Sequence, residues 1–270
     1  MAAAAPDPTL PDPVGQRSPA LVRFFARVMA RQMARNFHAV RVARPGIPAV
    51  PAGVPVLVYS NHPSWWDAAL LILLATQGFP GRRSFAPMEA AALEKYRFMA
   101  RIGLFPVATG TAAGAVAFMK VGERLLQDPA SMLWVTAEGQ FTDPRRRPVQ
   151  LRGGIAHLLV RLPRVVALPL AVEYPFWDEK TPEALCRFGP PIDTGEVDGR
   201  SPAGLHQLLE RRLEETMDVL AAGAMARDPK AFVTLSEGRA GVGGVYDLWR
   251  RARAWGRGER FDAAHGGGEP

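Results

Sequence analysis

The sequence predicts an α/β protein in which a twisted, mixed sheet is flanked by helices. Two observations support this fold class. Short apolar runs of strand length alternate with longer helical segments along most of the chain. The 270 residues are 48% hydrophobic, which is enough to bury the core of one domain of this kind. We find no internal repeat in the sequence, so a repeat architecture is not expected.

The individual elements follow from apolar patterning and from turn residues between the segments. The predicted strands are residues 56–60, 84–88, 132–137, 165–174 and 185–188. The predicted helices are residues 63–76, 90–102, 112–126, 154–162 and 202–222. Because β-type and helical segments alternate, the helices are expected to cover the faces of the sheet.

Composition divides the chain into four segments. Residues 1–20, rich in Ala and Pro, are expected to form a disordered leader, since they lack the basic region and apolar core of a secretory signal. Residues 21–44 are predicted to be a basic amphipathic helix, and residues 45–225 the main folded domain. Residues 226–270 are predicted to be a C-terminal extension, basic and aromatic in character.

The predicted helix over residues 21–44 has a basic side and an apolar side. Arginines recur at every fourth position, at Arg23, Arg27, Arg31 and Arg35. The opposite side carries Phe25, Met29, Met33 and Phe37. This pattern is typical of a helix that lies in a lipid interface. The alternative is a surface helix packed on the core, with its arginines in water.

Net charge indicates an anionic partner. The chain carries a formal charge of +7, with a pI of about 10.1, which suits nucleic acid, an anionic lipid surface or a phosphorylated substrate. Residues 245–261 mix aromatic rings with arginines, as in a lipid headgroup layer or a single-stranded nucleic-acid site. Since no nucleic-acid-binding signature accompanies them, we expect an anionic membrane surface and no nucleic acid.

The cellular location is predicted from cysteine content and hydropathy. A single cysteine, Cys186, excludes an internal disulfide and indicates a reducing compartment. No run reaches the roughly 18 to 20 apolar residues that a spanning helix needs. The protein is therefore predicted to be peripheral, on the cytoplasmic side of a membrane.

The segment after the first predicted strand carries a histidine and an aspartate in a suggestive order. His62 and Asp67 lie five residues apart, so inside one regular helix they would point about 140° from each other. Pro63 is predicted to start the helix, which leaves His62 outside and able to turn back toward Asp67. A carboxylate on one ring nitrogen would leave the other free as a base. In isolation such a spacing also arises by chance in polar surface loops.

This segment, Asn61-His62-x-x-x-x-Asp67, resembles the first motif of the glycerolipid acyltransferases. The resemblance implies that His62 is the general base, that Asp67 is its partner, and that residues 45–225 form the catalytic domain. It also implies an acyl-CoA or acyl-carrier-protein thioester as donor substrate, with no separate cofactor. The acceptor would be a hydroxyl group on a lysophospholipid or a glycerol-phosphate-type molecule.

The family's other motifs are matched in part. Glu138 and Gly139 match the third motif, but Phe141 stands where the family has an arginine that helps bind the acceptor's phosphate. The second motif is similar around Gly103, with Ala108 in place of another arginine. The fourth motif is similar around Pro169. By resemblance, the substrate-binding residues are Asn61, Glu138, Gly139, Gly103 and Pro169, together with Arg145 and Arg152. The arginines that could take the place of the missing ones are Arg145, Arg146, Arg147 and Arg152.

The missing arginines leave two alternatives open. The acceptor hydroxyl could belong to a lipid or pigment without phosphate, or the chain could be a non-catalytic, membrane-binding scaffold of the same fold. A second Glu-Gly-Arg sequence at residues 237–239 lies too far along the chain to be the third motif. No metal site is expected, because the other histidines lack ligand spacing: His38, His157, His206 and His265.

Overall fold

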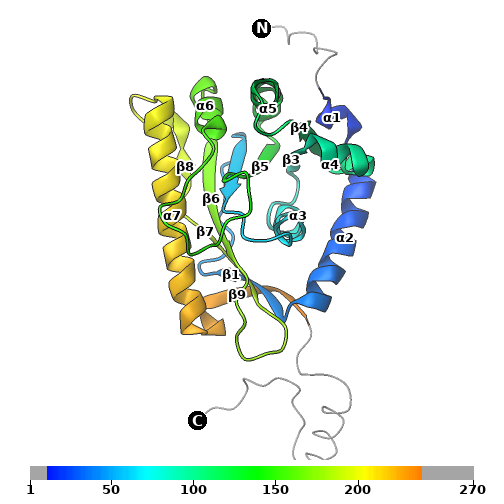
Figure 1. Cartoon of the computed structure of the whole chain (residues 1–270), viewed down its shortest axis with the longest axis vertical. Helices are drawn as coiled ribbons and strands as arrows, with labels where there is room; N and C mark the ends of the chain where they lie inside the picture. Colours follow the sequence, from blue (N-terminus) through cyan, green and yellow to red (C-terminus); the bar gives the residue numbers. More distant parts are fainter. Residues whose placement is uncertain (1–10, 239–270) are drawn as a thin grey trace, which may run out of the picture.

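A computed structural model describes residues 11–238, and it confirms the predicted α/β class. Within these residues nine strands form one mixed sheet in the order β4-β3-β5-β2-β6-β7-β1-β9, with β8 paired to β6 (Figure 1). The strands are β1 (Ala39–Ala43), β2 (Val56–Ser60), β3 (Arg83–Glu89), β4 (Leu104–Val107), β5 (Ser131–Thr136), β6 (Val166–Glu173), β7 (Ala184–Phe188), β8 (Ile192–Asp193) and β9 (Phe232–Glu237).

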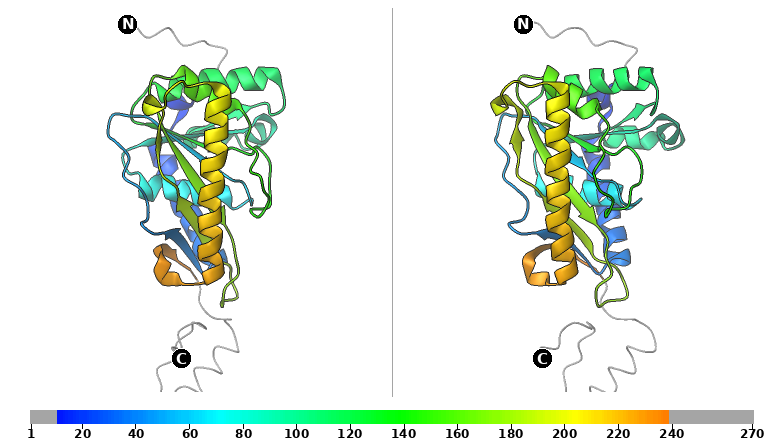
Figure 2. Two further views of the ribbon diagram at one scale, coloured as in Figure 1. Left: turned by 90° about the vertical axis from the view of Figure 1, so that its left-hand side faces the viewer. Right: turned by 60° about the vertical axis from the view of Figure 1, so that its left-hand side comes forward.

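The helices cover both faces of this sheet. They are α1 (Pro13–Gln16), α2 (Pro19–Asn36), α3 (Asp67–Gly78), α4 (Ala90–Lys95), α5 (Ala112–Leu126), α6 (Gly154–Arg161) and α7 (Pro202–Ala226), with short 3-10 helices η1 (Arg97–Ile102), η2 (Thr194–Glu196) and η3 (Pro229–Ala231). One core layer packs α5, α6 and α7 on the sheet, and the other packs α2 and α3. Figure 2 shows α7 running lengthwise in front of the strands.

Three central strands bring their carboxyl ends to one edge of the sheet. Strand β2 is parallel to β5 on one side and to β6 on the other, with Ser60 level with Thr136 and Leu170. All five β2 residues are buried, as is usual for a parallel strand covered on both faces. Loops that leave β2, β5 and β6 therefore start next to one another, where α/β sheets commonly bind ligands.

The predicted helix over residues 21–44 is wrong in its last third. Helix α2 ends at Asn36, and residues 39–43 form β1, which pairs with β7 and β9. The alternation around Val40 and Val42 suits a strand, and both side chains are buried. The apolar side of α2 packs on the core through Met33, while its four arginines are exposed. Met33 is buried and Met29 is partly buried, so this part of the apolar side packs on protein.

The two ends of the chain also differ from expectation. Residues 11–20, assigned to a disordered leader, include α1 and the start of α2. Residues 226–238, assigned to an extension, supply η3 and β9, an edge strand of the main sheet. Residues 1–10 and the aromatic segment 245–261 lie outside the described residues. Among residues 11–238, no helix combines the length and the apolar character needed to cross a bilayer.

Candidate active site

The predicted histidine–aspartate pair forms at the carboxyl edge of β2. The Nδ1 atom of His62 lies 2.6 Å from Oδ2 of Asp67. Because a carboxylate only accepts hydrogen bonds, Nδ1 carries the proton and Nε2 is left as the basic atom. The Asp67 side chain is 1% exposed, whereas that of His62 is 22% exposed. The pair is thus a buried carboxylate behind a partly open imidazole.

The local backbone reaches this geometry by a route that the sequence analysis did not predict. Pro63 does not start the helix, since α3 begins at Asp67. The residues between them form a turn in which Ser64 accepts hydrogen bonds from the backbone N–H groups of Trp66, at its hydroxyl, and of Asp67, at its carbonyl. His62 lies outside the helix, as predicted, but Asp67 is its first residue, where the helix dipole favours a negative charge.

The loop after β5 holds the backbone of His62 from both sides. The His62 N–H donates to Oε2 of Glu138 at 2.8 Å, and the His62 carbonyl accepts from the N–H of Thr142 at 2.9 Å. Burial raises the pKa of the Glu138 carboxyl, and the hydrogen bond from His62 partly opposes this rise. Glu138 therefore orients the histidine through its main chain, which is a supporting role.

Helix α7 anchors the far end of the same loop. Glu210 accepts from the Leu151 N–H at 3.0 Å, and Glu214 accepts from the Val149 N–H at 2.7 Å. One turn further along, Asp218 pairs with Arg147 at 2.6 Å. The three acidic residues recur every four positions, so they form one row on α7 that binds residues 147–151, at the end of the loop after β5.

Three residues expected to bind substrate lie within or directly after the strands, or away from His62. Asn61 is buried, its side-chain NH2 donates to the Val172 carbonyl and its side-chain oxygen accepts from the Val172 N–H, so it joins β2 to β6. Pro169 lies inside β6, level with Tyr59. Gly103 precedes β4, three strands from β2, and has a φ of +105°. A Cβ there would meet the Ser84 carbonyl at 2.6 Å, which explains why a glycine is needed.

The remaining predicted residues do lie on the loop after β5. Gly139 has a φ of +66°, and a Cβ there would lie 2.1 Å from Nε of Arg152, so the arginine packs directly on this glycine. Arg152 Nη2 is 3.5 Å from the Gly139 carbonyl oxygen. Arg145 is exposed and makes two bonds to Asp143, at 2.9 and 2.6 Å, which lower the pKa of that carboxyl. Of these two arginines, Arg145 is already neutralised by a partner.

Exposed aromatic side chains lie on the loops that leave the three central strands, and one of them contacts the histidine. Phe141 packs on the His62 ring, with ring centroids 4.4 Å apart, and is 61% exposed. Trp65, in the loop after β2, is 76% exposed, and Phe176, in the loop after β6, is 63% exposed. We call these three residues the aromatic rim. Each follows one of the three central strands within five residues, so the rim belongs to the same edge of the sheet as His62.

Sequence analysis missed one residue of the site, Tyr174. Its hydroxyl donates to Oδ1 of Asp67 at 2.7 Å, from the position directly after β6. Burial raises the pKa of this phenol well above its ordinary value, and the neighbouring Asp67 raises it further. The available signal was a tyrosine directly after an otherwise apolar strand that ends in Glu173, but nothing local linked it to a carboxylate 107 residues earlier.

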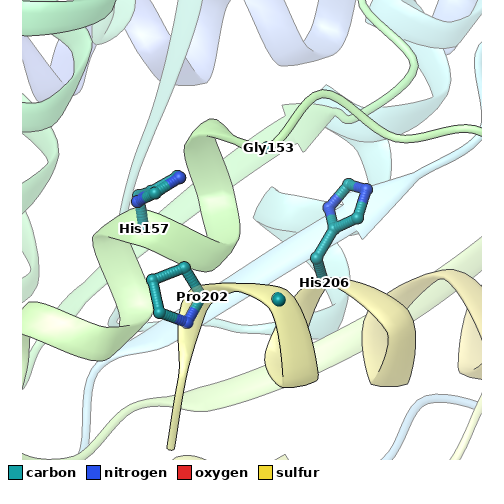
Figure 3. Close-up of a pocket in the computed structure, with 5 residues that line it drawn as sticks. Gly153, His157, Pro202 and His206 are labelled. Carbon is teal, nitrogen blue, oxygen red and sulfur yellow. The ribbon is translucent and has the colours of Figure 1, made fainter.

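A shallow depression of about 380 Å³ lies elsewhere, between the starts of α6 and α7. Figure 3 shows His157 on α6 and His206 on α7, with Pro202 at the start of α7. His206 Nε2 is 3.1 Å from Oε1 of Glu210. The fold thus brings together two histidines that are far apart in sequence, but the described residues include no cluster of three metal-ligating side chains.

Comparisons with known proteins concern the family and the fold of this chain. Residues 41–173 match the acyltransferase family. The fold is similar to the crystal structure of PlsC, the 1-acyl-sn-glycerophosphate (LPA) acyltransferase from Thermotoga maritima, with a TM-score of 0.53, 13% identity, and coverage of 75% of this chain and 79% of that chain. A search of curated proteins finds no match. The fold and the matched residues define an acyltransferase. Within that class, the similarity to PlsC is a similarity of fold, and it agrees with the resemblance to the glycerolipid acyltransferases that the sequence motifs gave.

Proposed function

We propose that the protein transfers an acyl group from a thioester to a lipid hydroxyl, with His62 as general base. The observation that carries this proposal is the 2.6 Å contact between His62 Nδ1 and the buried Asp67 carboxylate. Nε2 takes the proton of the hydroxyl while its oxygen attacks the thioester carbonyl. The C–S bond then breaks, the ester remains, and the thiolate leaves with the proton from the imidazolium. Asp67 stabilises the positive ring between these two steps.

The donor is acyl-CoA or acyl-carrier-protein, because both present the same thioester, and no further cofactor is needed for this chemistry. The acceptor is a lysophospholipid or a glycerol-phosphate-type molecule. Arg152 and the exposed Arg146 lie on the loop after β5 and supply the cations for its phosphate. Glu138 and Gly139 lie in the turn at the start of this loop, and Arg152 packs on Gly139.

A second candidate acceptor is the hydroxyl of a lipid or pigment that has no phosphate. It is favoured by Phe141, whose ring covers His62 and offers an apolar surface next to the base. It is also favoured by Arg145 and Arg147, which are paired with Asp143 and Asp218. An apolar wall and neutralised cations suit a neutral acceptor.

We also propose that the protein works as a peripheral protein on the cytoplasmic side of an anionic membrane. The exposed arginines of α2 supply positive charge, and the aromatic rim supplies side chains suited to a headgroup layer. Flotation with anionic and neutral vesicles tests this. Binding should require anionic lipid, weaken with salt, and fall in a Trp65→Ser, Phe176→Ser double variant. Equal binding to neutral vesicles, or none, would contradict the proposal.

The reaction is tested by incubating the purified full-length protein with a membrane lipid extract and a labelled acyl thioester. Mass spectrometry identifies the ester product, and a thiol reagent measures the released thiol. His62→Ala should lose about 10² to 10⁴ in turnover. The matched control is His157→Ala, an exposed histidine on α6, which should keep full activity. Substantial turnover in His62→Ala would refute the proposal. If the wild type released neither ester nor free thiol, the proposal would also be refuted, and the non-catalytic scaffold would be the remaining alternative.

A further inference from the structure

Tyr174 connects a second strand to the histidine–aspartate pair. It directly follows β6, and its hydroxyl donates to Oδ1 of Asp67 at 2.7 Å. Its ring packs on the buried Phe37, with centroids 5.4 Å apart, and Phe37 packs in turn on Trp66. The phenol is therefore fixed by packing as well as by its hydrogen bond.

The Asp67 carboxylate needs this donor because its charge is removed from water. One oxygen, Oδ2, faces His62 Nδ1 and accepts from the Ser64 N–H at 3.2 Å. The other oxygen, Oδ1, is the atom that Tyr174 reaches. A buried carboxylate without hydrogen-bond donors is strongly destabilised. Tyr174 thus supplies the hydrogen-bond donor for Oδ1, the carboxylate oxygen that His62 does not contact.

We infer that Tyr174 is a positioning residue for the proposed reaction, which fixes the Asp67 carboxylate and moderates the basicity of His62. The inference rests on the proposed role of His62 as general base. A phenol that donates to a carboxylate draws some of its negative charge away from the imidazole. Because burial and Asp67 both raise the pKa of the Tyr174 phenol, it stays protonated and keeps donating.

Removing the hydroxyl has two expected consequences of known sign. The carboxylate loses a donor, so its charge acts more strongly on the imidazolium and His62 holds its proton to higher pH. The carboxylate is also less firmly oriented, so the ring spends less time in the reactive position. Other charged groups around the pair are Glu138, on the loop after β5, and Arg146, which faces Glu138. Neither is changed by the substitution.

The experiment compares Tyr174→Phe with Tyr59→Phe in the full-length protein. Tyr59 is a matched control because its hydroxyl is also buried, in the adjacent strand β2, and has no hydrogen-bond partner among the described residues. In Tyr174→Phe, the NMR titration midpoint of the His62 ring should move to higher pH, the acidic limb of the kcat/KM profile should move with it, and kcat should fall on the order of tenfold. Tyr59→Phe should change none of these.

A milder perturbation tests the sign and avoids the risk that Tyr174→Phe fails to fold. Site-specific 3-fluorotyrosine at position 174 makes the phenol a stronger donor, so the His62 midpoint should move to lower pH. The NMR titration does not need turnover, so it separates the two proposals. If His62→Ala abolishes turnover but neither Tyr174 change moves the His62 midpoint, the positioning role is refuted alone. If the midpoints move as stated but the wild type makes no ester, the proposed function fails, whereas the coupling of Tyr174 to the His62–Asp67 pair stands.

Discussion

Asp67→Asn is the substitution that most directly tests how much the buried carboxylate contributes. The side chain keeps its shape and can still accept from His62 Nδ1, but it loses its charge. In the proposed reaction that charge faces an imidazolium whose centre lies roughly 4 Å away, and Asp67 is 1% exposed, so solvent screening is weak. At an effective dielectric of about 20, two such charges attract by about 4 kcal/mol. This corresponds to a loss of about 10³ in rate.

The assay measures steady-state acyl transfer at saturating thioester, with the released free thiol as the readout. We expect kcat to fall by about three powers of ten while KM changes little, because the carboxylate does not touch substrate. Asp143→Asn is the matched control, since Asp143 is an exposed carboxylate paired with Arg145 on the loop after β5. A loss of less than tenfold in a folded Asp67→Asn protein would show that the imidazolium is not stabilised by this pair.

Three further predictions concern the surroundings of the pair. Phe141→Arg should raise kcat/KM for phosphate-bearing acceptors relative to neutral ones, and an unchanged ratio would show that this position does not contact the acceptor. Because the pKa of Glu138 is raised in the folded state, its ionisation lowers stability as pH rises above the ordinary value of about 4.3. Glu138→Gln should therefore unfold at a higher temperature than the wild type at pH 7, with the difference vanishing below about pH 4; a lower melting temperature at pH 7 would contradict this. Gly103→Ala should lower the free energy of unfolding, measured in urea, by about 2 to 3 kcal/mol. Gly53→Ala, with open space around its Cβ position, should lower it by only about 1 kcal/mol. Equal losses would refute the role given to the Ser84 contact.

The parts of the fold that local pattern determines were predicted well. The helix over residues 112–126 has the predicted bounds, and the β2 strand at residues 56–60 does too. The failures occur where a segment is stabilised by distant partners. Residues 39–43 follow closely after a helix, and they form a strand because β7 and β9 lie on either side of them. Strand β9 itself is an edge strand paired only with β1 among the described residues.

The same distinction applies to the site. His62 and Asp67 lie five residues apart, so their pairing could be argued from chain geometry alone. Asn61 was misassigned because its partner, the backbone of Val172, is 111 residues away. Tyr174 was missed for the same reason. Contacts that cross between β2 and β6 are invisible to spacing rules, although they decide whether a polar side chain faces substrate or the protein.

The row of acidic residues on α7 has a consequence for how this protein can vary. The loop after β5 is hydrogen-bonded to the backbone of His62 near its start. Near its end it is hydrogen-bonded to Glu210 and Glu214 of helix α7. Lengthening or shortening the segment between Thr142 and Val149 would therefore disturb the hydrogen bonds at both of its ends, to His62 and to α7. Substrate preference is therefore more readily changed by substituting side chains on this loop than by altering the length of the loop.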